Sequence, residues 1–365
     1  MPMPTYFTDR EADCMFWALM AFAAFAVLVG LVVLGWIAYC GIFIPRQMPL
    51  PPALSGKREE LDTPAGRVSY YRAGPPAGRP LLLIHSVNAA GSAYEVLPLF
   101  DQYGGRRPVY ALELPGFGFS ARDNRPYTPR LMTDAIIAMA REITRLHGGP
   151  DGTVPVDALA LSLSSEFLAR AAMEQPDLFR SVAFVSPTGF NRSTPEQAPA
   201  GSTRAMPGLR RALTLPIWRR ALFAALTSRP SIRFFLEKTW GGKSIDEGMV
   251  TYDYATAHQP GAEHAPYCFV SGYLFSRDIR AIYRALSCPV WMLHGTRGDF
   301  VDYSGAPAFK DRPGWEIHIL ETGALPHFER LEVFAHAYDA FCSKLDAPGG
   351  SRIASGPEAA LRPHG

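Results

Sequence analysis

Cysteine is scarce in this chain of 365 residues, and net charge is almost absent. The five cysteines are odd in number and show no disulfide framework, which weakly favours a reducing compartment. The formal net charge is only +2, and so small an excess argues against a dedicated nucleic-acid binder. Apolar residues make up 48% of the chain, so a substantial core in one large domain is expected.

Motifs for cofactors and metals are also missing. The stretch Gly116-Phe117-Gly118 lacks the third glycine of a dinucleotide fingerprint and does not follow the first strand of a βα unit. No Walker-type phosphate loop occurs, and the nine histidines and five cysteines show no metal-ligand spacing. The sequence therefore predicts neither a cofactor nor a metal.

No charged residue occurs between positions 14 and 45. Residues 15–39 alone are long enough to cross a bilayer, since roughly 20 apolar residues span the hydrocarbon. Trp17 near one end, with Trp36 and Tyr39 near the other, is typical of interfacial aromatic belts. A secretory signal peptide is the alternative, but its apolar core normally covers only about 7–15 residues. We predict a single uncleaved membrane anchor.

The charges that flank this segment bear on its orientation. Arg10 is the one basic residue before it and stands among acidic residues, whereas Arg46, Lys57 and Arg58 follow it. Because basic residues tend to stay on the cytoplasmic side, the large domain is expected in the cytoplasm.

Short apolar runs alternate with stretches of helical periodicity along the rest of the chain. Such alternation predicts an α/β fold with a mostly parallel, doubly wound sheet and helices on both faces. Functional groups in these folds lie in loops beyond the carboxyl ends of the strands. The predicted strands are 79–84, 108–112, 156–161, 181–186, 289–295 and 316–320, and the predicted helices are 131–146, 276–286 and 329–341.

Ser162 is the most informative single residue. It follows the apolar run 156–161 and precedes a segment with helical spacing, so it stands where a strand turns abruptly into a helix. A serine at such a corner is a nucleophile elbow, in which the hydroxyl is forced out of the sheet. Ala160 and Ser164 replace the usual flanking glycines, and both are small enough for the close backbone approach. An ordinary serine at a strand end is the alternative.

Taken together, several motifs resemble the α/β-hydrolase fold family over about residues 60–345. The resemblance implies a nucleophilic serine, an acid and a histidine base in that order along the chain. Four features carry it in the family's order: His85-Ser86 where the family usually has His-Gly, the loop 113–120 like Asp-x-Pro-Gly-x-Gly-x-Ser, Ser162 at the elbow, and 289–299 like the strand that delivers the acid.

The resemblance assigns roles to individual residues. Ser162 is the expected nucleophile and Asp299 the expected acid, with Asp302 in reserve. Acyl transfer also needs donors for the developing oxyanion. The backbone N–H groups of Val87 and Leu163 are expected to supply them, and backbone donors tolerate side-chain changes nearby.

The base departs from the family pattern. Relatives usually read Gly-His-x-Pro-His-x-Glu after the last strand, and the first histidine is the base. In this chain the first position is Ala324 and only His327 remains. We expect His327 to act as base through a reshaped loop. Two alternatives stay open: a broken triad in a weak or non-hydrolytic protein, or service by another histidine.

Residues 191–273 form a long insert before the last strands, where the family commonly carries a helical cap. Its stretch 204–238 holds eight basic residues and only one acidic residue, interleaved with apolar ones. The plain interpretation is a cap whose apolar face lines the substrate pocket and whose arginines are exposed to solvent. The sharper interpretation is a cap that also rests on an anionic membrane surface.

These patterns predict a membrane-anchored serine hydrolase that cleaves an ester or related acyl bond of an apolar, lipid-like substrate. The alternatives are a non-catalytic binding or scaffold protein and a carbon–carbon bond hydrolase, since fold does not fix function. Apart from substrate and membrane, the sequence points to no nucleic-acid partner and leaves the oligomeric state open. The predicted segments are a tail at 1–14, a transmembrane helix at 15–44, a tether at 45–59, a core at 60–190 and 274–345, a helical cap at 191–273, and a disordered tail at 346–365.

Overall fold

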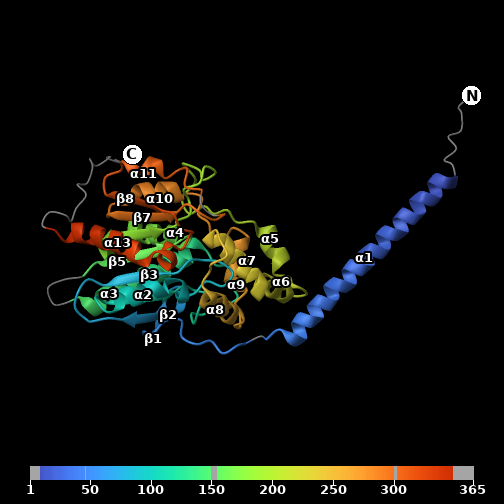
Figure 1. The fold of residues 1–365 in the computed structure, drawn as a ribbon, viewed down its shortest axis with the longest axis horizontal. Coiled ribbons are helices and arrows are strands. Elements are labelled where there is room, and N and C mark those ends of the chain that lie inside the picture. Colours follow the sequence, from blue (N-terminus) through green and yellow to red (C-terminus); the bar gives the residue numbers. More distant parts are fainter. Residues whose placement is uncertain (1–8, 46, 149–153, 300–301, 348–365) are drawn as a thin grey trace, which may run out of the picture.

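The computed structural model describes residues 9–45, 47–148, 154–299 and 302–347. Within them one eight-stranded sheet runs through the molecule in the order β1-β2-β4-β3-β5-β6-β7-β8 (Figure 1). Strand β2 pairs antiparallel with β1 and β4, and all other neighbours pair parallel. The strands are β1 Lys57–Thr63, β2 Gly66–Ala73, β3 Leu81–Ile84, β4 Val109–Glu113, β5 Val156–Leu161, β6 Phe179–Val185, β7 Val290–Gly295 and β8 Trp315–Leu320.

Helices cover both faces of the sheet. The apolar side chains of α3, α4 and α10 pack on one face, and those of α2 and α13 pack on the other. The helices are α1 Asp9–Phe43, η1 Ala93–Val96, α2 Leu97–Gly104, α3 Pro129–His147, α4 Ser164–Glu174, η2 Pro176–Leu178, α5 Pro207–Leu213, α6 Arg219–Leu226, α7 Arg229–Trp240, α8 Glu247–Ala257, α9 His264–Val270, α10 Ile279–Ala285, α11 Pro307–Lys310, α12 Pro326–Glu329 and α13 Leu331–Asp346.

The central strands are buried on both sides, which explains their continuous apolar sequences. All residues of β3 and β5 are buried. Leu82 and Ile84 belong to the core cluster on one face, whereas Leu81 and Leu83 belong to the cluster on the other. This alternation follows from the two-residue period of a strand.

Most of the predicted architecture is confirmed. Each of the six predicted strands and three predicted helices has its counterpart, and the sheet is mostly parallel with helices on both faces. Strands β1 and β2 were not predicted, and β1 begins at Lys57, inside the expected tether. Helix α1 begins at Asp9, inside the expected tail. Most of the predicted C-terminal disordered tail, 348–365, lies outside the described residues.

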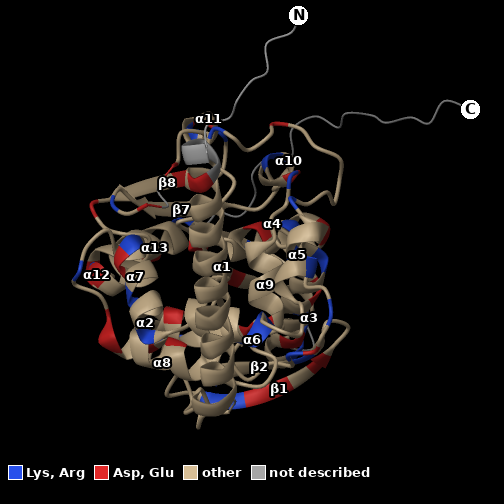
Figure 2. Cartoon of the chain, turned by 90° about the vertical axis from the view of Figure 1, so that its right-hand side faces the viewer, with Lys and Arg blue, Asp and Glu red and all other residues tan. Residues whose placement is uncertain are grey.

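Helices α5 to α9 lie within 191–273, the segment in which the sequence predicts a cap, and we call them the cap helices (Figure 1). Helix α1 projects away from the body and touches the cap near its own C-terminal end, where Trp36 Nε1 donates to the Ala221 carbonyl at 3.0 Å. Its stretch Asp13–Phe43 is long and apolar enough to cross a membrane, and its most apolar 18-residue window is not buried against the protein. Figure 2 views α1 from the front, with the cap helices behind it.

Candidate active site

The Ser162 corner is strained. Ser162 connects β5 to α4 with φ at +50°, a left-handed conformation that side chains other than glycine rarely adopt. Hydrogen bonds fix it, because its N–H donates to the Val185 carbonyl at 2.8 Å and its carbonyl accepts from Ser165 N at 3.1 Å. Such strain costs on the order of 1–3 kcal/mol and persists only where the surroundings impose it. The predicted elbow geometry is therefore present.

The small residues that flank the elbow have defined positions. Ala160 is fully buried, and Ser164, also fully buried, donates from Oγ to the His85 carbonyl at 2.6 Å. This bond ties the start of α4 to the loop that follows β3. The serine that replaces the family glycine at position 164 thus fastens the elbow to the expected oxyanion loop.

Two backbone donors are unpaired beside this bond. Val87 and Leu163 are both buried, and in the described part of the chain neither N–H donates to a protein acceptor. Buried N–H groups without partners are rare in folded proteins. The pair therefore has the chemistry expected of an oxyanion site.

A buried carboxylate that sequence reasoning missed shapes this loop. Glu95 accepts from Ser86 N and from Asn88 Nδ2, each at 2.7 Å. Burial raises the pKa of Glu95, while the donors from Ser86 and Asn88 act in the opposite direction. Asn88 in turn accepts from Ala90 N at 2.7 Å, so it fixes the turn. The acidic residue nine positions after Ser86 was the only available signal.

His85 is a structural residue. Its Nδ1 lies 2.6 Å from the Ser86 carbonyl, and its Nε2 accepts from Leu114 N at 3.0 Å. Complete burial lowers its pKa to about 4. Both nitrogens are therefore engaged, and the neutral ring joins the loop after β3 to the loop after β4.

Within the described part of the chain, neither expected acid forms a hydrogen bond or ion pair with a histidine. Asp299 is 2.9 Å from Lys238 Nζ on α7, and its own N–H donates to the Lys238 carbonyl at 3.2 Å. Asp302 accepts from Ser304 N at 3.1 Å and from Arg192 N at 3.4 Å. The Ser304 hydrogen bonds lower the pKa of Asp302. Lys238 therefore holds the carboxylate that was expected to orient the base.

His327 lies in the core. It is fully buried in the first turn of α12, and its Nε2 lies 2.7 Å from the Glu95 carbonyl. Among the residues that the structure describes, its Nδ1 has no hydrogen-bond partner, and the ring packs against Phe328 and Phe334. Burial lowers the pKa of His327 to about 4. The expected hydrogen-bonded chain from Ser162 through His327 to Asp299 is not formed, because α12 turns this ring towards η1.

Ser186 and His294 lie at the carboxyl ends of β6 and β7, the two strands that follow β5 in the sheet. Ser186 also has a positive φ, +49°, at the end of β6 next to Ser162. His294, near the end of β7, stacks on Tyr303 with ring centroids 3.8 Å apart, and its Nδ1 lies 2.9 Å from the Gly295 carbonyl. Burial lowers the pKa of His294. This ring is packed against Tyr303.

The C-terminal turn of α7 lies between the acid loop and the loop where relatives carry the base. Its Lys238 carbonyl accepts from Asp299 N, and its Thr239 carbonyl accepts from Ala324 N at 2.9 Å. Gly323 N donates to Glu329 Oε1 at 2.7 Å, which closes the loop before α12. The cap is therefore fastened by main-chain bonds to both loops.

Gly323 allows this close packing. A Cβ at position 323 would lie 2.6 Å from the Cα of Trp240 and 2.7 Å from the Thr239 carbonyl oxygen. We expect Gly323→Ala to lower the free energy of unfolding by about 1–3 kcal/mol, since backbone must shift to admit the methyl group. Urea unfolding would measure the change.

Gly242→Ala is the matched control. Its Cβ would approach only the Arg297 Nη1 atom, at 4.0 Å, so we expect a change within about 0.5 kcal/mol. Equal effects of the two substitutions would contradict the packing of α7 on the Gly323 loop.

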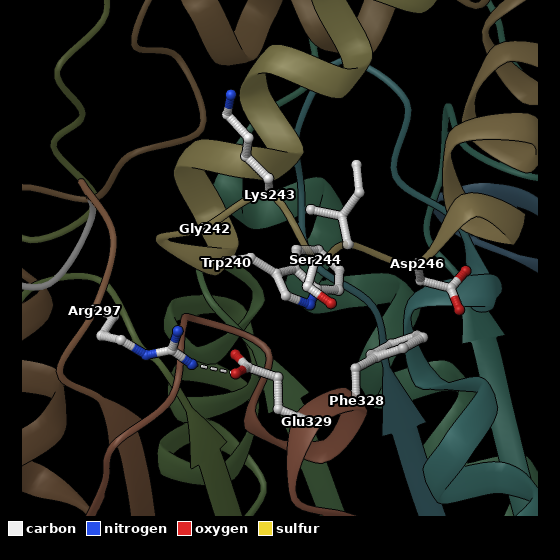
Figure 3. A pocket seen from close by; sticks show the side chains of 9 residues that line it. Trp240, Gly242, Lys243, Ser244, Asp246, Arg297, Phe328 and Glu329 are labelled. Atoms are coloured by element: carbon white, nitrogen blue, oxygen red, sulfur yellow. Dashed lines mark hydrogen bonds and ion pairs between the residues drawn. The ribbon is translucent and has the colours of Figure 1, made fainter.

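A groove opens beside this contact (Figure 3). It has a volume of about 490 Å³ and lies between the loop after α7 and the loops around Arg297 and Glu329, which pair with each other. Ser162 is not among its lining residues, so the groove is separate from the elbow. Those residues are Trp240, Gly242, Lys243, Ser244, Ile245, Asp246, Arg297, Phe328 and Glu329.

A model of the alpha/beta hydrolase family matches residues 81–337. The chain belongs to this family. The matched span contains the elbow, the loop after β3 and all of helices α5 to α9 of this α/β hydrolase. No curated protein matches its sequence.

Solved structures with the same fold include enzymes of different chemistry. A membrane phospholipase A described as a bacterial virulence factor is 17% identical, with a TM-score of 0.60 over 93% of this chain and 100% of that one. A meta-cleavage product hydrolase from Pseudomonas fluorescens IP01 is 16% identical, with a TM-score of 0.59 over 78% and 98%. A thermophilic esterase from Thermogutta terrifontis is 16% identical, with a TM-score of 0.56 over 80% and 100%. These similarities concern the fold.

Proposed function

We propose that this α/β hydrolase cleaves an ester or related acyl bond of an apolar, lipid-like substrate through an acyl-enzyme on Ser162. The single observation that carries the proposal is the strained φ of +50° at Ser162, beside the unpaired N–H groups of Val87 and Leu163. A strained serine next to two free donors is the arrangement that acyl transfer requires.

The chemistry follows from these groups. Ser162 Oγ attacks the carbonyl carbon, and the oxygen that becomes negative accepts from the two N–H groups. The C–O bond to the alcohol breaks as water donates a proton to the departing oxygen. A second water then attacks the acyl carbon, a proton returns to Ser162 Oγ, and the acid is released. The family position of the base is Ala324, so the Ser162 proton passes to water in the site, and the reaction is slow. Removing triad members typically leaves rates about 10³–10⁴-fold above the uncatalysed reaction.

The substrate class rests on the surroundings of the site. The cap contributes apolar side chains to both core clusters and exposes others, and α1 is apolar enough for a membrane. An apolar acyl chain fits such an environment. We propose that α1 anchors the enzyme to the membrane and that the main domain lies in the cytoplasm.

A second candidate is a binding protein for acyl ligands. Two observations favour it, the burial of His327 against the Glu95 carbonyl and the ion pair between Asp299 and Lys238. Both engage expected members of the triad in contacts with other residues. A binding protein would keep the backbone donors of Val87 and Leu163 without turnover.

A fluorophosphonate with a long alkyl chain separates the two candidates. We expect slow covalent labelling of Ser162, identified by mass spectrometry of the modified peptide, because the phosphorus centre mimics the acyl carbon. Ser162→Ala should abolish the labelling. Ser186→Ala is the matched control, since Ser186 shares the positive φ, and it should leave labelling intact.

Two results would contradict hydrolysis. One is the absence of labelling after long incubation, and the other is labelling that survives Ser162→Ala. Saturable binding of a long-chain fatty acid by an unlabelled protein would then establish the second candidate.

A further inference from the structure

We propose that the outer face of α5, α6 and α7 is a second membrane contact, which lies on an anionic lipid surface beside the anchor α1. This proposal goes beyond hydrolysis, because it does not depend on Ser162. We call this surface the cap face. Its large exposed apolar side chains are Leu209, Leu215, Ile217, Leu222, Phe234 and Phe235.

The exposure of these side chains is unusual for a surface in water. Ile217 is 61% exposed and Phe234 is 54% exposed, and the Phe234 and Phe235 rings contact each other on one helix. Exposed apolar patches of this kind mark contacts with proteins, ligands or membranes. The cap face therefore calls for a covering partner.

Charge selects the partner. The stretch 204–236 contains seven arginines and no acidic residue. Arg211 and Arg220 are exposed, and within the described residues neither forms an ion pair. Aromatic and aliphatic side chains interleaved with arginines are typical of helices that lie in an anionic lipid interface. Each basic residue near such a surface contributes about 1 kcal/mol to binding.

The position of α1 places the cap face at the depth of the lipid headgroups. Trp36 donates to the Ala221 carbonyl of α6, and Cys40 packs with Ala221 and Ala224. About 20 residues of a helix fill the hydrocarbon, and tryptophan prefers the interface. If the part of α1 that precedes Trp36 fills the hydrocarbon, the contact between Trp36 and α6 lies at the interface between lipid and water.

The arrangement in space agrees with this placement. Helices α5, α6 and α7 lie on the side of the body that faces α1, whereas α13 lies on the side away from it (Figure 1). Figure 2 shows this side facing the viewer, with basic segments of the cap behind α1, which is largely without charge. The bilayer that receives α1 therefore meets the cap face.

The experiment uses the full chain in vesicles with a fluorophore on one cysteine. Cys14 is exposed and is replaced by serine, while the other four cysteines are buried. Phe234→Cys carries the fluorophore on the cap face, and Val333→Cys carries it on α13 as the matched control. Both residues are exposed and apolar. The vesicles contain phosphatidylcholine, with or without phosphatidylglycerol, and brominated acyl chains act as the quencher.

We expect the fluorophore at 234 to lose about half of its emission in vesicles with phosphatidylglycerol, because interfacial helices lie roughly 5–10 Å into the headgroup boundary. The fluorophore at 333 should be unaffected. Added salt and the double substitution Arg211→Glu, Arg220→Glu should each reduce the quenching at 234, since both weaken the attraction to anionic lipid.

Four outcomes would overturn the proposal. The first is quenching at 234 that does not exceed that at 333. The second is equal quenching with and without phosphatidylglycerol, which removes the anionic selection. The third is an unquenched fluorophore whose emission changes on dilution of the protein in the vesicles, which indicates a second copy on the cap face. The fourth is a chain that does not float with the vesicles, because α1 then supplies no anchor.

Discussion

Replacing Ala324 with histidine is expected to raise the rate of ester hydrolysis by about 10²–10⁴-fold, the usual contribution of a positioned general base. Position 324 is where the family carries its base, and Ala324 is partly exposed in the loop between β8 and α12. Its N–H bond to Thr239 belongs to the main chain, so the new side chain leaves it intact. Hydrolysis of a medium-chain nitrophenyl ester would measure the gain.

The gain should depend on the rest of the site. Ser162→Ala in the Ala324→His background should return the rate to the uncatalysed level. Lys238→Met in the same background should raise the rate further, because it frees Asp299 from the ion pair at 2.9 Å and lets it orient the new imidazole. An unchanged rate in a folded Ala324→His protein would indicate that the oxyanion donors or the nucleophile are not aligned for acyl transfer.

The elbow was predictable from sequence because its signals are local. An apolar strand, a serine and a helical segment within 20 residues specify the corner at Ser162, and the backbone confirms it with a positive φ. The six parallel strands were predictable for a related reason. The inner strands β3, β4, β5 and β7 are buried along their whole length, so they appear as short, largely apolar runs, whereas β8 at the edge is only partly buried.

Strand β1 escaped prediction because its sequence is polar. Strand β1 reads Lys-Arg-Glu-Glu-Leu-Asp-Thr and lies at the edge of the sheet, where it pairs only with β2. Charged residues on an edge strand discourage pairing with other chains. The same charges hide the strand from a search for apolar alternation, and the segment resembled a tether.

The fate of the expected acid and base could not be deduced from sequence because it depends on a contact far along the chain. The last turn of α7 belongs to the cap, yet its main-chain carbonyls hold both Asp299 N and Ala324 N. Ala324 itself signalled the departure from the family pattern. The partners that Asp299 and His327 find instead, Lys238 and Glu95, have no local signature.

The sequence also contained no sign of which titratable groups are buried. Burial raises the pKa of Glu113 and of Glu166 to about 7, and it lowers the pKa of His85 and of His327 to about 4. The carboxyls bind more protons in the folded state, so their contribution to stability falls as pH rises. The histidines bind more protons in the unfolded state, so their contribution rises with pH. These opposed effects mask each other in the wild-type pH profile.

His327→Gln is therefore expected to reveal its effect as a difference from wild type that changes sign with pH. The pKa of His327 is about 4 in the folded protein and about 6.5 in the unfolded chain. Through this residue alone, lowering the pH from 7 to 4 therefore lowers the free energy of unfolding by about 3 kcal/mol. Glutamine keeps an N–H donor for the Glu95 carbonyl but cannot be protonated. At pH 7 the variant should be about 1 kcal/mol less stable, because packing is lost.

At pH 4 the same variant should be about 2 kcal/mol more stable than wild type. Protonation of His327 stabilises the unfolded wild-type chain at this pH, whereas glutamine takes up no proton. Urea unfolding of both proteins in detergent at the two pH values measures the difference, from which the carboxyl contributions cancel. Labelling of Ser162 by the fluorophosphonate at pH 7 should be unchanged. A difference in stability that is constant with pH, together with labelling that falls about 100-fold or more, would instead make His327 the base.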